Sequence, residues 1–214
     1  MVHIKRVIIG VILFGLLISS LHSQVALADA SWKAAYRKFL NSSTSKVYGM
    51  KISEYDGKIK FEIKDMNKDG IPELVFDTSL YYGDQCPEVL YTFYNGKVKC
   101  AGEAGHAGGF YQFNNSKIFQ VEAYKWGSVY FTYYYYYKLN KGKMRLVASH
   151  IVDCGNDGMG NKSTYKISGK KSTKAKFNNF LKKNKCGGKK VRVGSKYAIT
   201  SENIEKATKK GIVS

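Results

Sequence analysis

Residues 61–77, FEIKDMNKDGIPELVFD, carry side-chain oxygens at the spacing of a cation-binding loop. Acidic or amide side chains stand at every second position over five residues, and Gly70 directly follows them. Calcium takes about six to eight oxygen ligands, and a tight loop presents oxygens from alternate residues when a glycine permits the turn at its sixth position. Counting from the first acid, a backbone carbonyl falls at position 7 and a carboxylate at position 9. The pattern predicts a calcium site with these ligands: Asp65, Asn67, Asp69, Ile71 and Glu73.

The segment resembles the D-x-[DN]-x-D-G-x-x-[DE]-L calcium loops of FG-GAP and VCBS repeats, which are related at the loop to EF-hands and dockerins. It differs from an EF-hand because Pro72 stands at position 8 and Phe76 replaces the bidentate glutamate at position 12. The flanks at 60–63 and 74–76 alternate like strands. The resemblance therefore implies a strand-loop-strand site with structural calcium. The alternative is a polar hairpin turn in which Asp and Asn accept hydrogen bonds from backbone amides.

The chain has 214 residues and a formal net charge of +19, from 35 Lys and Arg against 16 Asp and Glu. Its hydrophobic fraction of 44% excludes a disordered polyelectrolyte. Four of the basic residues are Arg and the other 31 are Lys, which argues against specific nucleic-acid recognition because Arg is the usual bidentate reader of bases and phosphates.

The positive charge is concentrated near the C-terminus. Residues 161–214 carry 16 basic and two acidic side chains, or +14. We expect this part to hold the protein electrostatically on an anionic cell-wall polymer or another acidic surface. A solvated Lys face that only aids solubility is the alternative.

The first 30 residues have the layout of a secretory signal peptide. A short basic region precedes the apolar run 7–17, and small residues at 26–30 provide a cleavage site after Ala28 or Ala30. The apolar run is short for a membrane span, so we expect cleavage, no transmembrane anchor afterwards, and a secreted or extracellular protein.

Export would permit disulfides among the four cysteines. An Asn95-Gly96 hairpin turn would place Cys100 opposite Tyr91 rather than opposite Cys86, and the sequence selects none of the three possible connectivities. No C-x-x-C or H-x-x-x-H spacing supports zinc. The disulfide candidates are Cys86, Cys100, Cys154 and Cys186.

The elements that must position these groups follow from periodicity. Residues 31–41 place apolar side chains on one helix face. Residues 89–102, 110–124 and 129–151 each read as an aromatic strand, a polar turn and a second strand, which predicts antiparallel hairpins. The Tyr run 133–137 lies inside a strand, with alternate rings on opposite faces. It is interpreted as sheet filler, with a stacking platform for sugars or bases as the alternative.

Beyond the sheet we expect a short strand at 165–167 and a turn at 168–171. We also expect a helix capped by Ser172 and ended by Gly187-Gly188, and a final helix from Thr200 or Ser201 to Gly211. The predicted fold is α+β: a mainly antiparallel Tyr-rich β-meander with an N-terminal helix and a basic helical C-terminal part. The expected organisation is a signal peptide (1–30), a calcium-loop and meander domain (31–158), and a Lys-rich part (159–214) packed on it.

This layout is similar to that of small secreted proteins of Gram-positive bacteria. It implies a non-enzymatic calcium-binding protein of the cell surface or extracellular space. No G-x-S-x-G, P-loop or Rossmann spacing is present. A secreted hydrolase acting on cell wall or carbohydrate is the alternative, with convergent acids expected near His106 in a glycine-rich loop.

Overall fold

The computed structural model describes residues 31–78, 88–104, 108–125, 130–155 and 162–209. The predicted signal peptide, Cys86 and His106 lie outside these ranges.

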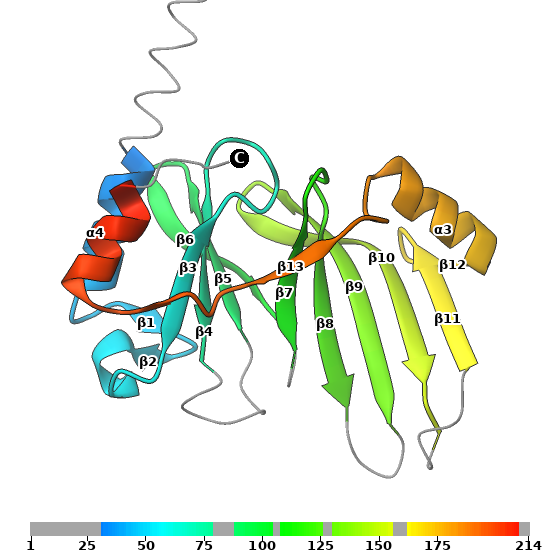
Figure 1. Ribbon diagram of the computed structural model, residues 1–214, viewed down its shortest axis with the longest axis horizontal. Helices are drawn as coiled ribbons and strands as arrows, with labels where there is room; N and C mark the ends of the chain where they lie inside the picture. The colour runs from blue at the N-terminus through cyan, green and yellow to red at the C-terminus, as the bar shows by residue number, and fades with distance from the viewer. Residues whose placement is uncertain (1–30, 79–87, 105–107, 126–129, 156–161, 210–214) are drawn as a thin grey trace, which may run out of the picture.

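Two antiparallel sheets form most of the protein (Figure 1). The five-stranded sheet has the order β14 (Tyr197–Ala198), β3 (Lys60–Lys64), β4 (Glu73–Asp77), β5 (Val89–Tyr94) and β6 (Lys97–Glu103). The seven-stranded sheet has the order β12 (Lys170–Ser172), β11 (Lys162–Ile167), β10 (Lys143–Asp153), β9 (Phe131–Asn140), β8 (Phe119–Lys125), β7 (Gly109–Phe113) and β13 (Lys190–Val193). A small ribbon of β1 (Lys46–Val47) and β2 (Met50–Lys51) leads into the 3-10 helix η1 (Ile52–Tyr55).

Short helices cover the outer faces of both sheets. Residues 31–41 form a helix, as predicted, and lie with α4 (Ser201–Lys209) against the five-stranded sheet. The helix α3 (Lys174–Lys183) packs on the seven-stranded sheet. A mostly antiparallel sheet protein with three short helices confirms the α+β class.

The hairpin at β5 and β6 has the register that the sequence predicted. Asn95 and Gly96 both adopt left-handed backbone, with φ of 51° and 74°, as a two-residue turn of matching twist requires. Tyr91 is consequently paired with Cys100. The expected hairpins β7–β8 and β9–β10 are also formed.

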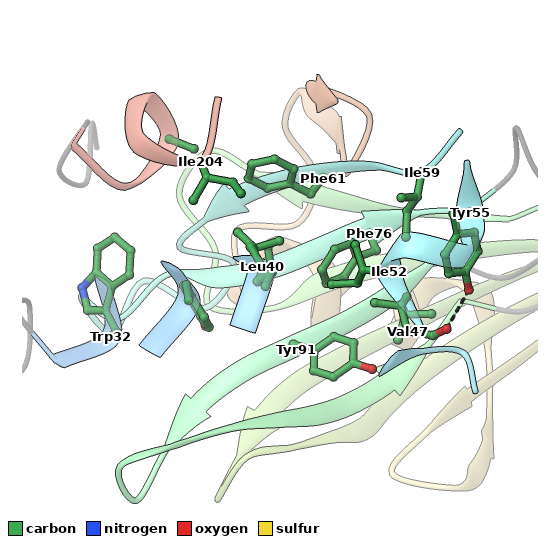
Figure 2. Close-up of a cluster of buried hydrophobic side chains, with 14 residues drawn as sticks. Trp32, Leu40, Val47, Ile52, Tyr55, Ile59, Phe61, Phe76, Tyr91 and Ile204 are labelled. Carbon is green, nitrogen blue, oxygen red and sulfur yellow. Dashed lines mark hydrogen bonds between the residues drawn. The ribbon is translucent and has the colours of Figure 1, made fainter. Parts of the chain in front are cut away.

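The core of the five-stranded sheet lies beneath the N-terminal helix (Figure 2). Leu40 points from the helix toward Phe61 and Phe76 of the sheet, Trp32 belongs to the same cluster, and all four side chains are buried. Ile204 extends this contact from α4. Burial of such side chains contributes roughly 1.5–3 kcal/mol each before entropy costs, so helix and sheet depend on each other.

The Tyr run contacts different layers from its two faces. Tyr136 is buried against Phe177 of α3, with ring centroids 5.7 Å apart. Tyr135 and Tyr137 point the other way, toward the cluster between the sheets. The rings of Tyr133 and Tyr135 stack on each other at 5.8 Å and 10°, so each covers a face of the other and leaves less ring surface for a sugar or base.

The C-terminal part differs from its prediction. Thr173 caps α3 instead of Ser172, accepting a hydrogen bond from the Lys176 amide at 3.3 Å. The helix ends at Lys183, before Gly187-Gly188, because Lys185 takes the left-handed conformation at φ 58°.

The most consequential difference is that residues 190–198 supply two strands that the sequence reasoning did not predict. β13 pairs with β7 at one edge of the seven-stranded sheet, and β14 pairs with β3 at one edge of the five-stranded sheet. One segment thus joins both sheets, as the orange strand crossing Figure 1 shows.

Candidate metal centre

The predicted calcium loop connects β3 and β4. It turns back within a few residues because Lys68 and Gly70 adopt positive φ values of 58° and 91°. Gly70 has nothing within 4 Å of where a Cβ would stand, so backbone conformation rather than space calls for glycine there.

Side-chain oxygens of the loop hold the turn by accepting backbone hydrogen bonds. The Asp65 carboxylate accepts from the amides of Asp69 at 3.2 Å and Gly70 at 3.0 Å. Asp69 accepts from the Ile71 amide at 2.9 Å and from the Asn67 side-chain amide at 2.8 Å. Such bonds are the ones that the polar-turn alternative requires. Each uses part of the acceptor capacity of its oxygen, so the oxygens keep lone pairs for a cation.

Glu73 lies on the buried side of the loop at the first position of β4. Its carboxylate accepts hydrogen bonds from the Met66 amide at 2.9 Å and the Thr92 hydroxyl at 3.1 Å, and the residue is fully buried. Burial raises the pKa of Glu73 well above its usual value, and the charges of Asp69 and Asp65 raise this pKa further. Glu73 is therefore costly to ionise without a nearby cation.

No basic side chain in the described ranges forms an ion pair with this loop. Across the described residues, Asp65, Asp69 and Glu73 form no ion pair, whereas the Lys and Arg side chains pair with other carboxylates: Glu54, Glu62, Glu88, Glu122 and Glu205. In a chain with a net charge of +19, three neighbouring carboxylates without a basic partner are notable.

The loop is anchored to the layers on both sides of it. The Tyr36 hydroxyl donates to the Pro72 carbonyl at 2.8 Å, which ties the loop to the N-terminal helix. The side chain of Gln112 donates to the Asp65 carbonyl from β7 of the other sheet. The backbone of the loop is therefore positioned by both sheets.

The structure brings the predicted ligands into one loop without gathering their carboxylates around a point. In the ranges that the structure describes, no group of three or more His, Cys, Asp or Glu side chains is placed to hold a metal ion. Two of the predicted donors, the Asn67 amide and the Ile71 carbonyl, are neutral oxygens outside those residue types. Oxygen donors of this kind are the ligands that a hard cation such as calcium prefers.

A second polar cluster, between the sheets, escaped the sequence reasoning. Glu88 accepts from the Phe110 amide at 2.7 Å and from the Arg192 guanidinium at 2.8 Å. Desolvation by burial raises the pKa of Glu88 to about 7, although Phe110 and Arg192 act in the opposite direction. Nearby, the Ser195 hydroxyl donates to Asp77. The alternation of basic and apolar residues at 190–193 was the sequence signal for the strand that carries Arg192.

The cysteines give no support to a disulfide in the described residues. Cys100, Cys154 and Cys186 are free thiols there, and Cys86 lies outside those ranges. Burial raises the thiol pKa of Cys100 and of Cys186, which lowers their reactivity. A disulfide, and the hydrolase site expected near His106, stay predictions.

The chain matches no known family model, no curated protein and no solved structure. Of the helices in the described ranges, none combines the length and apolar character needed to cross a membrane.

Proposed function

We propose that this protein is a secreted, non-enzymatic calcium-binding protein of the cell surface or extracellular space. Calcium would be structural, bound by the loop that joins β3 and β4. A Tyr-rich sheet would form the body, and the basic helical C-terminal part would hold it on an anionic cell-wall polymer.

The observation that carries the calcium proposal is the set of three loop carboxylates without a basic partner. Asp65 and Asp69 lie beside the buried carboxylate of Glu73, and no ion pair reaches them in the described part of the chain. A bound divalent cation would supply the positive charge that offsets their mutual repulsion. The residues that would hold it are Asp65, Asn67, Asp69, Ile71 and Glu73.

The calcium proposal is tested by thermal unfolding in chelator and in calcium. For an extracellular site of millimolar affinity, about 10 mM calcium should raise the Tm by roughly 3–6 °C. Asp65→Asn should abolish most of this rise because it removes a charged ligand. Asp56→Asn is the matched control, since Asp56 occupies another left-handed turn at φ 51° outside the loop. An equal Tm in chelator and calcium would refute calcium binding.

Attachment to an acidic surface is supported by the exposed lysines of residues 162–189. The Debye length shortens from about 10 Å at 0.1 M salt to about 3 Å at 1 M, so binding of the protein to purified cell walls should fall steeply over that range of salt. Because residues 190–198 complete both sheets, charge-neutralising variants are better probes than truncation. Retention that is insensitive to salt would contradict electrostatic attachment.

A further inference from the structure

A hollow of about 650 Å³ lies between the β7–β8 turn and the C-terminal half of α3. Figure 1 shows these two elements at the same end of the seven-stranded sheet. The walls carry three ammonium groups and three side-chain amides, from Lys182, Lys185, Lys189, Asn114, Asn115 and Asn178. The apolar side chain of Leu181 and the adjacent Gly187-Gly188 segment also line it.

The lining is positively charged. Among the residues that the structure describes, no Asp or Glu lines the hollow. Lys182, Lys185 and Lys189 are exposed, and none of the three forms an ion pair with a described residue. The hollow therefore offers cationic groups and amide donors to an anion rich in acceptor oxygens.

The two walls of the hollow are fixed relative to each other. The Ser116 hydroxyl, next to the β7–β8 turn, donates to the Asn184 carbonyl at 2.6 Å and lies 3.3 Å from the Cys186 sulfur. Phe177, which is buried, holds α3 on the sheet. The backbone positions of the lysines are thus set before any ligand arrives, which reduces the ordering cost of binding.

Solvation and helix-dipole compensation do not account for the whole arrangement. Basic residues in a last helical turn complement the dipole, and Lys182 has that place. Lys185 and Lys189, however, lie beyond the end of α3. The last carbonyls of α3 already accept backbone bonds: those of Phe180, Leu181 and Lys182 receive the amides of Asn184, Cys186 and Lys185.

The geometry points to a binding site for the phosphate groups of a phosphate-bearing polymer, and this inference rests on the proposed attachment to an anionic wall polymer. Phosphate presents several strong acceptor oxygens and a negative charge, which match ammonium and amide donors together. A volume of about 650 Å³ falls within the roughly 300–1,000 Å³ typical of ligand pockets. It accommodates a short segment of polymer with more than one phosphate.

The test uses the full mature chain and a fluorescent glycerol-phosphate oligomer, with binding followed by anisotropy at physiological salt. A pocket variant carries Lys182→Gln, Lys185→Gln and Lys189→Gln. The control variant removes the same charge from the β11–β12 hairpin through Lys166→Gln, Lys170→Gln and Lys171→Gln, all exposed positions outside the hollow. Urea unfolding of each variant verifies that it is folded.

We expect the pocket variant to lose roughly tenfold in affinity and the control variant less than about twofold. Equal losses of affinity in the two variants would overturn the proposed pocket but would agree with a diffuse electrostatic attachment. Absence of binding by the unaltered protein would overturn both the pocket and the proposed attachment.

Two further probes identify the source of the phosphate. Inorganic phosphate, at the same total phosphate concentration, should not displace the oligomer. Displacement would show that the site binds single phosphate ions, and it would overturn the assignment of a polymer as the ligand. The protein could instead bind phosphatidylglycerol vesicles more tightly than the oligomer, with the pocket variant losing this binding. That result would identify a lipid surface as the ligand and overturn the assignment of a polymer.

Discussion

The buried carboxyl of Glu88 predicts an unusual response to pH. Its side chain is 2% exposed, whereas its partner Arg192 is 50% exposed. Glu88→Gln imitates the protonated acid in size and neutrality; its single acceptor oxygen keeps the hydrogen bond from either Arg192 or the Phe110 amide and loses the other, a cost that does not change with pH. Because the guanidinium of Arg192 keeps its contact with water, losing the ion pair leaves no fully buried charge behind.

The magnitude follows from the pKa of Glu88, which burial raises from an ordinary 4.5 to about 7 in the folded protein. Between these pH values the folded state binds more protons than the unfolded state, so stability falls as the pH rises. The full difference in pKa corresponds to about 3 kcal/mol of folding stability, which is present below pH 4.5 and lost by about pH 7. The Gln variant lacks this titration. It should therefore gain about 3 kcal/mol relative to the unaltered protein between pH 4.5 and pH 7.5.

The assay is urea unfolding of both proteins at several pH values from 4.5 to 7.5, in chelator, followed by tryptophan fluorescence. Taking the difference between the two proteins cancels other titrating groups, including Glu73. Parallel pH profiles of the two proteins would show that burial of Glu88 does not cause the loss of stability. If the Gln variant becomes less stable than the unaltered protein as the pH rises, the ion pair with Arg192 stabilises the fold by more than the desolvation of Glu88 costs.

Two other substitutions test the packing of α3 and the calcium loop. Phe177→Ala should cost about 3–5 kcal/mol in urea unfolding because the side chain is buried between α3 and the Tyr136 ring, and a loss under about 1 kcal/mol would contradict that role. Gly70→Ala should lower stability by about 1 kcal/mol or more and reduce calcium-dependent stabilisation, because φ is 91°; Gly187→Ala, equally uncrowded, is the control and should change stability little.

Local signals in the sequence were sufficient for the hairpins. Asn95-Gly96 fixes its turn through backbone preference alone, so the register that places Tyr91 opposite Cys100 needed no tertiary information. The N-terminal helix was equally predictable from the spacing of Trp32, Tyr36 and Leu40, all of which are buried.

Long-range pairing was beyond the same reasoning. The segment Lys190–Val193 alternates basic and apolar residues, but this alternation does not show which strand it joins or that Lys190 and Arg192 pair with Glu122 and Glu88. Those partners are 68 and 104 residues away in sequence, and no local pattern encodes such distances. The predicted single meander is divided into two sheets because β6 and β7, which follow each other in the chain, do not pair.

For the candidate metal centre, spacing predicted which residues share the loop and that strands flank it. Spacing could not predict that Glu73 is fully buried, or that Thr92 and the Met66 amide bond to it, because these follow from how β4 packs against β5 and the other sheet.

The position of residues 190–198 has a consequence for the order of folding. Without β13 and β14, strands β7 and β3 would be open edges with unpaired backbone groups, which are templates for aggregation. Their partners lie far downstream, at residues 190–198, so neither edge can be protected until synthesis has passed residue 198. A nascent or C-terminally shortened chain should be prone to self-association through β3 and β7, and a chaperone that covers these two strands would keep it soluble until they are paired.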